Sequence, residues 1–220
     1  MSYTVIGAPL SPFVRKVHLT MQLKGLDYDM EPVSPFALPE GYEKINPLKR
    51  IPVLKHGDDY ICDSSVICQY LEDLHPESEL IPTSPLLRAR VAWYEKIGDT
   101  ELAPAITFAA FRHRVIYRSM GTPYDEAEVA ALIAEKAPPL YDYLDSMIGD
   151  HNYLVDGRLT LADIAIVTQL INASLGDERA DAQRWPNLAR YTDFHFASEV
   201  FAPTIERAQK MVGKMLANAG

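Results

Sequence analysis

The chain has 220 residues, of which 48% are hydrophobic, 10% aromatic and 23% charged. This composition can bury one or two hydrophobic cores and argues against a disordered chain. With 21 Lys and Arg against 30 Asp and Glu, the formal net charge is −9, which argues against nucleic acid or an anionic membrane as the main partner. A small basic pocket for an anionic ligand remains compatible with that charge.

The sequence also predicts the environment in which the protein works. Its two cysteines, Cys62 and Cys68, cannot form a disulfide framework, so a reducing compartment fits best. Residues 1–5 have neither a basic start nor a long apolar run, and no secretory signal is expected. The longest apolar stretch, 164–171, is interrupted by polar residues and is too short to span a membrane. We therefore expect a soluble, cytoplasmic protein.

The first part of the chain alternates strand and helix patterns. The expected elements are a strand at 3–7, a helix after Pro12 that ends near Gly25, a strand at 28–33, a possible short helix within 38–46, strands at 52–56 and 59–62 joined through Gly57 and Asp58, and a helix from Ser64 that ends before Pro76. This order predicts a small mixed sheet with helices packed on it.

The rest of the chain is helical in pattern. The stretch from Pro76 to Pro85 is polar and carries three prolines, Pro76, Pro82 and Pro85, which indicates a linker at 77–86. The expected helices are a long one over 86–120 with a kink near Pro104, one over 124–148, and two that start near Thr160 and Asn187. The sequence therefore predicts an α+β two-domain protein, with an α/β domain at 1–76 and an all-α domain at 87–220.

Ser11 and Pro12 open the first predicted helix directly after the first strand. Serine at the N-cap with proline at N1 is a common way to start a helix, and on spacing alone this structural interpretation is favoured. The functional alternative is a hydroxyl at a helix N-terminus that faces a ligand. The two are compatible, because the oxygen accepts from helix amides while the proton is donated to an anion.

Two further segments admit a structural and a ligand-binding interpretation. Pro52 starts a predicted strand, where proline is tolerated, and a trans bond after Ile51 is the usual form. A cis bond would turn the backbone of Ile51 outward, where an extended peptide can pair with it; Arg50 beside it is by default a solvated charge. Asp63 and Ser64 are expected to cap the next helix. Alternatively they hold an amino-acid head group, with amides and hydroxyl on its carboxylate and Asp63 on its ammonium group.

Other candidate positions favour structural roles. Thr160 and Asp163 have the spacing of a capping box before an apolar helix, and we expect them to start that helix without taking part in chemistry. The six histidines form no HxxxH or HxH pair, so no metal site is expected. The two cysteines are expected to be ordinary thiols. The basic stretch 112–118 is by default a solvated helix face. The weaker alternative is that it lines a cleft between the two domains.

Four blocks of the sequence, taken together, resemble the cytosolic glutathione transferases over nearly the whole chain. They are residues 11–17 (SPFVRKV), 46–54 (NPLKRIPVL), 63–71 (DSSVICQYL) and 160–165 (TLADIA). The resemblance implies a thioredoxin-like N-terminal domain with a mixed four-stranded sheet and an all-helical C-terminal domain that carries the electrophile site. It also implies a homodimer and a cis bond at Pro52.

The resemblance further implies a role for each residue at a matching position. Ser11 matches the catalytic serine of the serine-type classes, closest to the tau class and to bacterial members. Ile51 would pair its main chain with the cysteinyl part of glutathione next to Pro52. Asp63 and Ser64 match the acidic residue and serine that hold the γ-glutamyl head group. Arg50, where lysine is common, would contact the glycine carboxylate. Two positions depart from the family pattern: Arg50 stands in place of lysine, and Asp63 in place of the longer glutamate of many classes. They indicate that the contacts to glutathione differ in detail from those of the family.

The implied function is a glutathione S-transferase that holds the glutathione thiol as a thiolate and conjugates it to a hydrophobic electrophile. Serine at position 11 cannot form a mixed disulfide, which favours conjugation, with a glutathione-dependent peroxidase or isomerase as alternatives. The zeta-like serine–cysteine cluster is absent, which lowers the isomerase alternative. A non-catalytic interaction module and a ligand-storage protein on the same scaffold are further alternatives. The expected ligands are glutathione as co-substrate and a small electrophile, without a metal.

Overall fold

The computed structural model describes residues 2–219, which form two compact units, the first up to Arg88 and the second from Ala89 onward. The elements of the first unit are β1 (Tyr3–Ile6), α1 (Pro12–Leu23), β2 (Tyr28–Glu31), the 3-10 turn η1 (Tyr42–Lys44), β3 (Val53–His56), β4 (Asp59–Cys62) and α2 (Ser64–Leu74). The predicted β-α-β-β-β-α order, with a short helical turn before β3, is confirmed.

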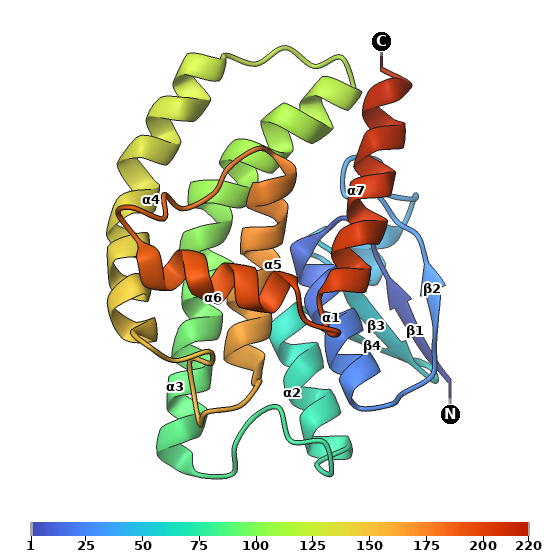
Figure 1. Ribbon diagram of the computed structural model, residues 1–220. Helices are drawn as coiled ribbons and strands as arrows, with labels where there is room; N and C mark the ends of the chain where they lie inside the picture. The colour runs from blue at the N-terminus through green and yellow to red at the C-terminus, as the bar shows by residue number, and fades with distance from the viewer. Residues whose placement is uncertain (1, 220) are drawn as a thin grey trace. The chain divides into compact units, whose positions relative to one another are not determined.

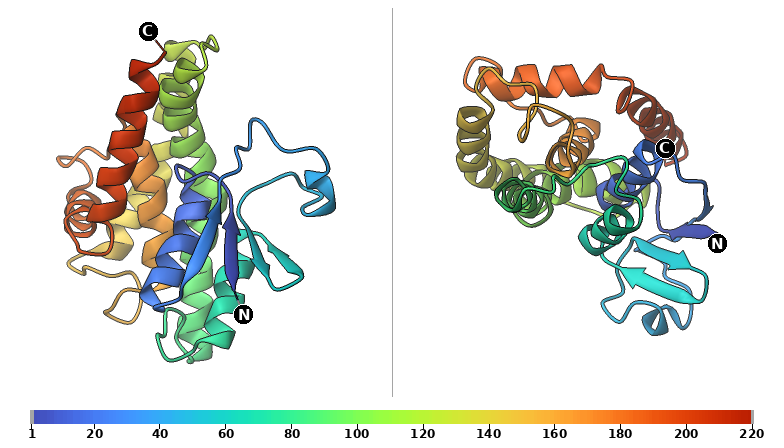
Figure 2. Two further views of the ribbon diagram at one scale, coloured as in Figure 1. Left: turned by 90° about the vertical axis from the view of Figure 1, so that its right-hand side faces the viewer. Right: turned by 90° about the horizontal axis from the view of Figure 1, so that it is seen from below.

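The four strands form one mixed sheet in the order β2-β1-β3-β4. β1 pairs parallel with β2 through the crossover that contains α1, and antiparallel with β3, which in turn pairs antiparallel with β4. Helices α1 and α2 pack against each other on one face of the sheet (Figures 1 and 2). This is the predicted thioredoxin-like arrangement.

Apolar patterning explains which strands are central. The inner strands β1 and β3 bury Val5, Ile6, Val53 and Leu54 almost completely, so both faces of these two strands are covered. The edge strand β2 alternates between half-buried and exposed residues. In the hairpin between β3 and β4, Gly57 has a φ of 62°, the left-handed conformation that glycine adopts without steric cost.

The second unit is entirely helical among its described residues. Its elements are α3 (Pro85–Lys96), which begins in the first unit, the π-helix η2 (Ile97–Tyr117), α4 (Glu126–Ile148), α5 (Leu161–Leu175), α6 (Pro186–Phe196) and α7 (Ala202–Ala217). In Figure 1, α5 lies beside η2 and α6 crosses the bundle. None of the helices in residues 2–219 has the length and apolar content that a membrane crossing needs.

The region in which one long helix was expected, residues 86–120, has a different structure from the one predicted. Instead of a kinked α-helix, the chain passes from α3 into a 21-residue π-helix that contains Pro104. Gly98 packs η2 closely on α5, because a Cβ at Gly98 would lie 2.9 Å from the Ala165 carbonyl oxygen. Helix α7 has no counterpart among the predicted helix starts.

Candidate active site

Helices α1 and α2 of the first unit run in the same direction, with their N-termini adjacent. Near the start of both helices, Lys16 Nζ donates to Ser65 Oγ at 3.2 Å. One turn further along both helices, Thr20 Oγ1 lies 3.3 Å from Cys68 Sγ. Since later residues of α1 contact later residues of α2, the helices are parallel, and the segments that precede them meet at one end of the unit.

Ser11 is the N-cap of α1, in an extended conformation with φ −70° and ψ 129°. Its Oγ accepts a hydrogen bond from the Val14 amide at 3.4 Å, a long bond. The residue is half-buried. In this arrangement the hydroxyl proton is left to donate to a ligand, so the capping interpretation and the ligand interpretation are compatible.

Asp63 is the N-cap of α2 and has an exposed side chain. Its Oδ1 accepts from the Ser65 amide at 2.9 Å and from the Val66 amide at 3.5 Å. The φ of Asp63 is 76°, an uncommon conformation for a residue other than glycine. Ser64, which follows it, is only 3% exposed. A helix start with a solvent-facing carboxylate can take an ammonium group and a carboxylate side by side.

The loop before β3 is held by hydrogen bonds from two buried side chains that were not among the predicted site residues. Asn46 Nδ2 donates to the Arg50 carbonyl oxygen at 2.8 Å, and the Tyr42 hydroxyl donates to the same oxygen at 3.0 Å. Both side chains belong to buried residues. The Ile51–Pro52 peptide bond is cis, as the resemblance implies. Although its carbonyl oxygen is held in this way, the Arg50 side chain is exposed.

Gly7 brings two of these segments together and was also missed. A Cβ at Gly7 would lie 2.6 Å from Val14 Cγ2 and 3.4 Å from Ile51 Cβ. The end of β1 therefore touches both the first turn of α1 and the residue before Pro52. A glycine at a strand end is a signal for such close approach, although it does not say which backbone approaches.

The structure thus gathers the predicted first-unit residues into one region. Gly7 joins the segment of Ser11 to Ile51 and Pro52, and the parallel helices place Asp63 and Ser64 next to the start of α1. Two helix N-termini point their amides toward this region, which suits an anionic ligand. The exposed Arg50 lies in the same loop, directly before Ile51.

Thr160 and Asp163 lie in the second unit, where they form a capping box at the start of α5. Asp163 Oδ2 accepts from the Thr160 amide at 2.9 Å, and Asp163 Oδ1 accepts from the Leu154 amide at 2.9 Å and from the Tyr191 hydroxyl at 3.0 Å. Burial raises the pKa of Asp163 to about 6, while the hydrogen bonds from Leu154, Thr160 and Tyr191 act in the opposite direction. Its contacts are with the protein itself and have a structural purpose.

Other reactive side chains have structural surroundings. The Cys62 thiol donates to the Ile45 carbonyl oxygen at 3.4 Å, and burial raises its pKa, which disfavours a nucleophilic thiolate. In the basic stretch, Arg114 binds the Glu126 carboxylate at 2.7 Å and the Gly176 carbonyl oxygen at 2.9 Å. Within residues 2–219, no three His, Cys, Asp or Glu side chains are grouped to hold a metal ion.

Comparisons with known proteins cover both units. Residues 5–79 match the model of the glutathione S-transferase N-terminal domain, and residues 112–198 match that of the C-terminal domain. A glutathione S-transferase of Triticum aestivum is 28% identical over 204 residues, 92% of each chain. A maleylacetoacetate isomerase of Pseudomonas aeruginosa is 28% identical over 84% of this chain and 87% of its own. A crystal structure of a glutathione S-transferase from Methylobacterium radiotolerans, in complex with glutathione sulfonate, has a TM-score of 0.75 at 29% identity, over 93% of this chain and 95% of that one.

Proposed function

This chain belongs to the glutathione S-transferase superfamily, and we propose that it is a cytoplasmic, homodimeric transferase of the serine type. It conjugates glutathione to a small hydrophobic electrophile. The observation that carries the proposal is the Ser11 hydroxyl at the start of α1, next to the Ile51–Pro52 loop and the Asp63–Ser64 helix start. A structural neighbour in complex with glutathione sulfonate supports glutathione as the co-substrate.

Each part of glutathione has a counterpart in this region. The exposed Asp63 carboxylate takes the ammonium group of the γ-glutamyl residue, and Ser64 with the amides of the α2 N-terminus takes its carboxylate. The main chain of Ile51 pairs with the cysteinyl residue beside Pro52. Arg50 takes the glycine carboxylate as an exposed ion pair. With glutathione bound in this way, we expect its cysteinyl sulfur to lie at Ser11.

The Ser11 hydroxyl can supply the free energy that thiol activation needs. A free thiol has a pKa near 8.5, and a shift to near neutrality needs about 2 kcal/mol. A hydrogen bond from a neutral hydroxyl to a thiolate contributes about 1.5–3 kcal/mol, and the helix N-terminus adds about 0.3–1 kcal/mol. Ser11 therefore stabilises the thiolate without losing its own proton. The sulfur lone pair then forms a bond to the electrophilic carbon. In a substitution the leaving group departs from that carbon with the electron pair of its bond. In an addition the electron pair of the multiple bond moves away from that carbon, and the atoms that receive it take up a proton.

Glutathione-dependent isomerisation is the second candidate, because a maleylacetoacetate isomerase is among the similar proteins. Here the thiolate adds to a cis double bond, the carbon–carbon bond rotates, and the thiolate leaves again. The same Ser11 contact is needed. A turnover screen over aryl halides, enones, isothiocyanates, hydroperoxides and a cis-enedione acid separates the two candidates by product.

Replacement of Ser11 tests the proposed activation. In Ser11→Ala, the thiol pKa of bound glutathione is expected to rise by about one to two units, because one charge-assisted hydrogen bond is lost. The ultraviolet absorbance of the thiolate in the binary complex, followed against pH, measures this shift.

Asp125→Ala is the matched control. Asp125 caps α4 in the second unit by accepting from the Ala127 amide at 2.7 Å, so this variant also loses an N-cap, at about 1 kcal/mol. Its thiol titration is expected to equal that of the unmodified protein. A Ser11→Ala titration that coincides with the control removes Ser11 from the proposed role. Retention on immobilised glutathione with no thiolate absorbance favours the non-catalytic module instead.

A further inference from the structure

A row of buried polar side chains lies along the interface between α1 and α2. On α1 the row uses every fourth residue, Lys16, Thr20 and Lys24, where Lys24 is the C-cap of the helix. On α2 it uses Ser65, Cys68 and Glu72. All except Ser65 are at most 6% exposed. Because apolar residues would suffice to pack two helices, a polar row at this position needs an explanation.

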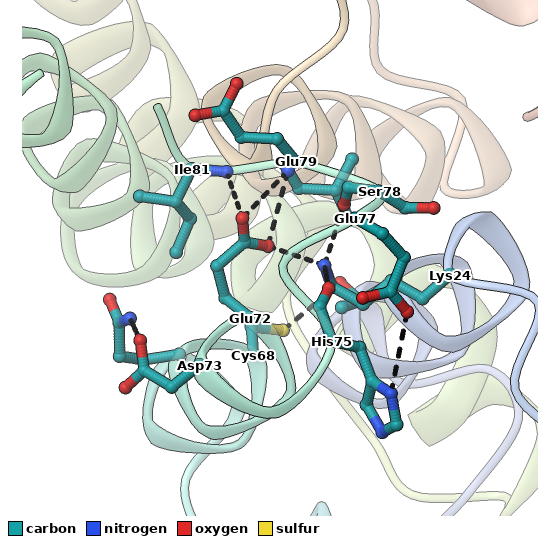
Figure 3. A network of polar contacts seen from close by, with 12 residues as sticks. Lys24, Cys68, Glu72, Asp73, His75, Glu77, Ser78, Glu79 and Ile81 are labelled. Carbon is teal, nitrogen blue, oxygen red and sulfur yellow. Dashed lines mark hydrogen bonds and ion pairs between the residues drawn. The ribbon is translucent and has the colours of Figure 1, made fainter. Parts of the chain in front are cut away.

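The last step of the row is an ion pair far from the candidate site. Lys24 Nζ lies 2.7 Å from Glu72 Oε2, with side chains 0% and 6% exposed (Figure 3). We call Lys24 and Glu72 the α1–α2 clamp. Since each α-helical residue advances about 1.5 Å, Lys24 lies about 20 Å from Ser11, and Glu72 lies about 13 Å from Asp63. Neither side chain of the clamp reaches a ligand at the helix N-termini.

The clamp has a full set of directional partners. The Lys24 ammonium also donates to the His75 carbonyl oxygen at 2.8 Å and to the Ser78 carbonyl oxygen at 2.7 Å, so its three protons are all used. The Glu72 carboxylate also accepts from the amides of Leu80 and Ile81, at 3.2 Å each to Oε1. The clamp thus fixes α1, α2 and the chain after α2 to one another in a single geometry.

We propose that the α1–α2 clamp is a positioning pair, which sets the relative placement of the two helix N-termini that hold Ser11 and Asp63–Ser64. The inference rests on the proposed function. Two parallel helices joined by apolar packing alone can slide or rotate slightly, whereas an ion pair with fixed hydrogen bonds at their far ends resists both motions. A site that holds a thiol and an amino-acid head group needs its groups placed to within about 0.5 Å.

The test compares Glu72→Gln with Lys24→Arg. The Glu72→Gln variant keeps the shape of the side chain but loses the charge, and is expected to raise the Kd for glutathione about tenfold, by misplacing one helix start against the other. The Lys24→Arg variant keeps the charge and several donors, and is expected to retain most of the affinity. Amide hydrogen exchange at Val14, Ser65 and Val66 provides a second readout, because these amides report the two helix starts.

Val5→Ala is the stability-matched control. Val5 is a fully buried residue of β1 outside the polar row, so its truncation lowers stability without loosening the clamp. A higher Kd and faster exchange at both helix starts in Glu72→Gln, with neither in Val5→Ala, supports the positioning role. Equal changes in both variants, or an unchanged Kd in Glu72→Gln, overturns it. If the unmodified protein fails to bind glutathione, the proposed function fails, and the exchange comparison alone decides the positioning role.

Discussion

Gly7 is the residue at which a single added carbon has the most direct consequence for the site. A Cβ there would overlap Val14 Cγ2 at 2.6 Å, so Gly7→Ala must displace either the first turn of α1 or the end of β1. We expect a loss of about 1–3 kcal/mol in the free energy of unfolding, the usual cost of overpacking. Weaker glutathione binding should accompany it, and denaturant unfolding with calorimetric titration measures both.

Gly213 offers a matched control for that substitution. It lies within α7, and a Cβ there would meet nothing within 4 Å. Gly213→Ala should therefore stabilise the protein by up to about 1 kcal/mol, because alanine favours the helix, and leave glutathione binding unchanged. Equal binding by Gly7→Ala and Gly213→Ala would remove Gly7 from the account of the site.

At the residue scale, local roles could be predicted and distant partners could not. The capping roles of Ser11 and Asp63 follow from residue type next to a helix start. The bond from Asn46 to the Arg50 carbonyl oxygen depends on the path of the loop, and the proximity of Gly7 to Ile51 depends on how β1 and β3 pair. Neither has a signal in local spacing.

At the scale of elements, the capping box of α5 supports a specific expectation. In Asp163→Asn, an amide nitrogen can replace Oδ2 and face the Thr160 amide, which leaves a buried donor unpaired. The expected loss is about 1–3 kcal/mol in the free energy of unfolding, whereas Thr160→Ala, which keeps the carboxylate, should lose about 1 kcal/mol. Urea unfolding of both variants measures the difference. An Asp163→Asn variant as stable as the unmodified protein would contradict a structural role for this carboxylate.

The same helix shows why some elements were predicted and others were not. The start of α5 was found because a capping box uses residues three apart. The π-helical form of η2 was missed, because the spacing of apolar residues predicts a helix without distinguishing its type. The close packing of Gly98 on α5 involves Ala165, a residue far away in the chain, and has no local signal. The clamp between Lys24 and Glu72 was missed for a similar reason: its partners are 48 positions apart in the chain (72 − 24).

At the scale of the whole molecule, two buried groups give stability opposite dependences on pH. Burial raises the pKa of Asp163 from 3.8 to about 6. The contribution of this group to the free energy of unfolding is therefore largest below the pKa of the unfolded chain and falls as pH rises toward 6. Burial lowers the pKa of His195 to about 4. Its contribution is present above the unfolded pKa near 6.5 and is lost as pH falls toward 4. Between about pH 4 and 6 the two groups change the free energy of unfolding in opposite directions as pH varies.

Replacement of His195 should reveal its share of the pH dependence of stability. At neutral pH the His195 Nε2 proton is donated to the Asn152 carbonyl oxygen at 2.9 Å, and the ring contacts the rings of Tyr191 and Phe201. His195→Gln should be less stable because it disturbs both the hydrogen bond and these ring contacts. The stability deficit should shrink by up to about 3 kcal/mol as pH falls from 7 to 4, since glutamine does not titrate. Urea unfolding at several pH values measures it, and a deficit that does not change with pH would contradict burial of a neutral imidazole.

The division into a sheet-containing unit and a helical unit was predictable from the change in periodicity along the chain, because strand and helix patterns differ in period. The proposed site in the first unit came from the resemblance of residues 11–17, 46–54 and 63–71 to a known family, because two helix starts and a proline taken alone also fit purely structural roles. The electrophile was not predictable, because the side chains that select it do not form a local motif.

A crystal structure with bound glutathione would show directly whether Ser11 contacts the thiol. We expect the cysteinyl sulfur within hydrogen-bonding distance of Ser11 Oγ, with the γ-glutamyl group at Asp63 and Ser64 and the peptide beside Ile51. A sulfur directed away from Ser11, or a tripeptide bound elsewhere on the protein, would contradict it.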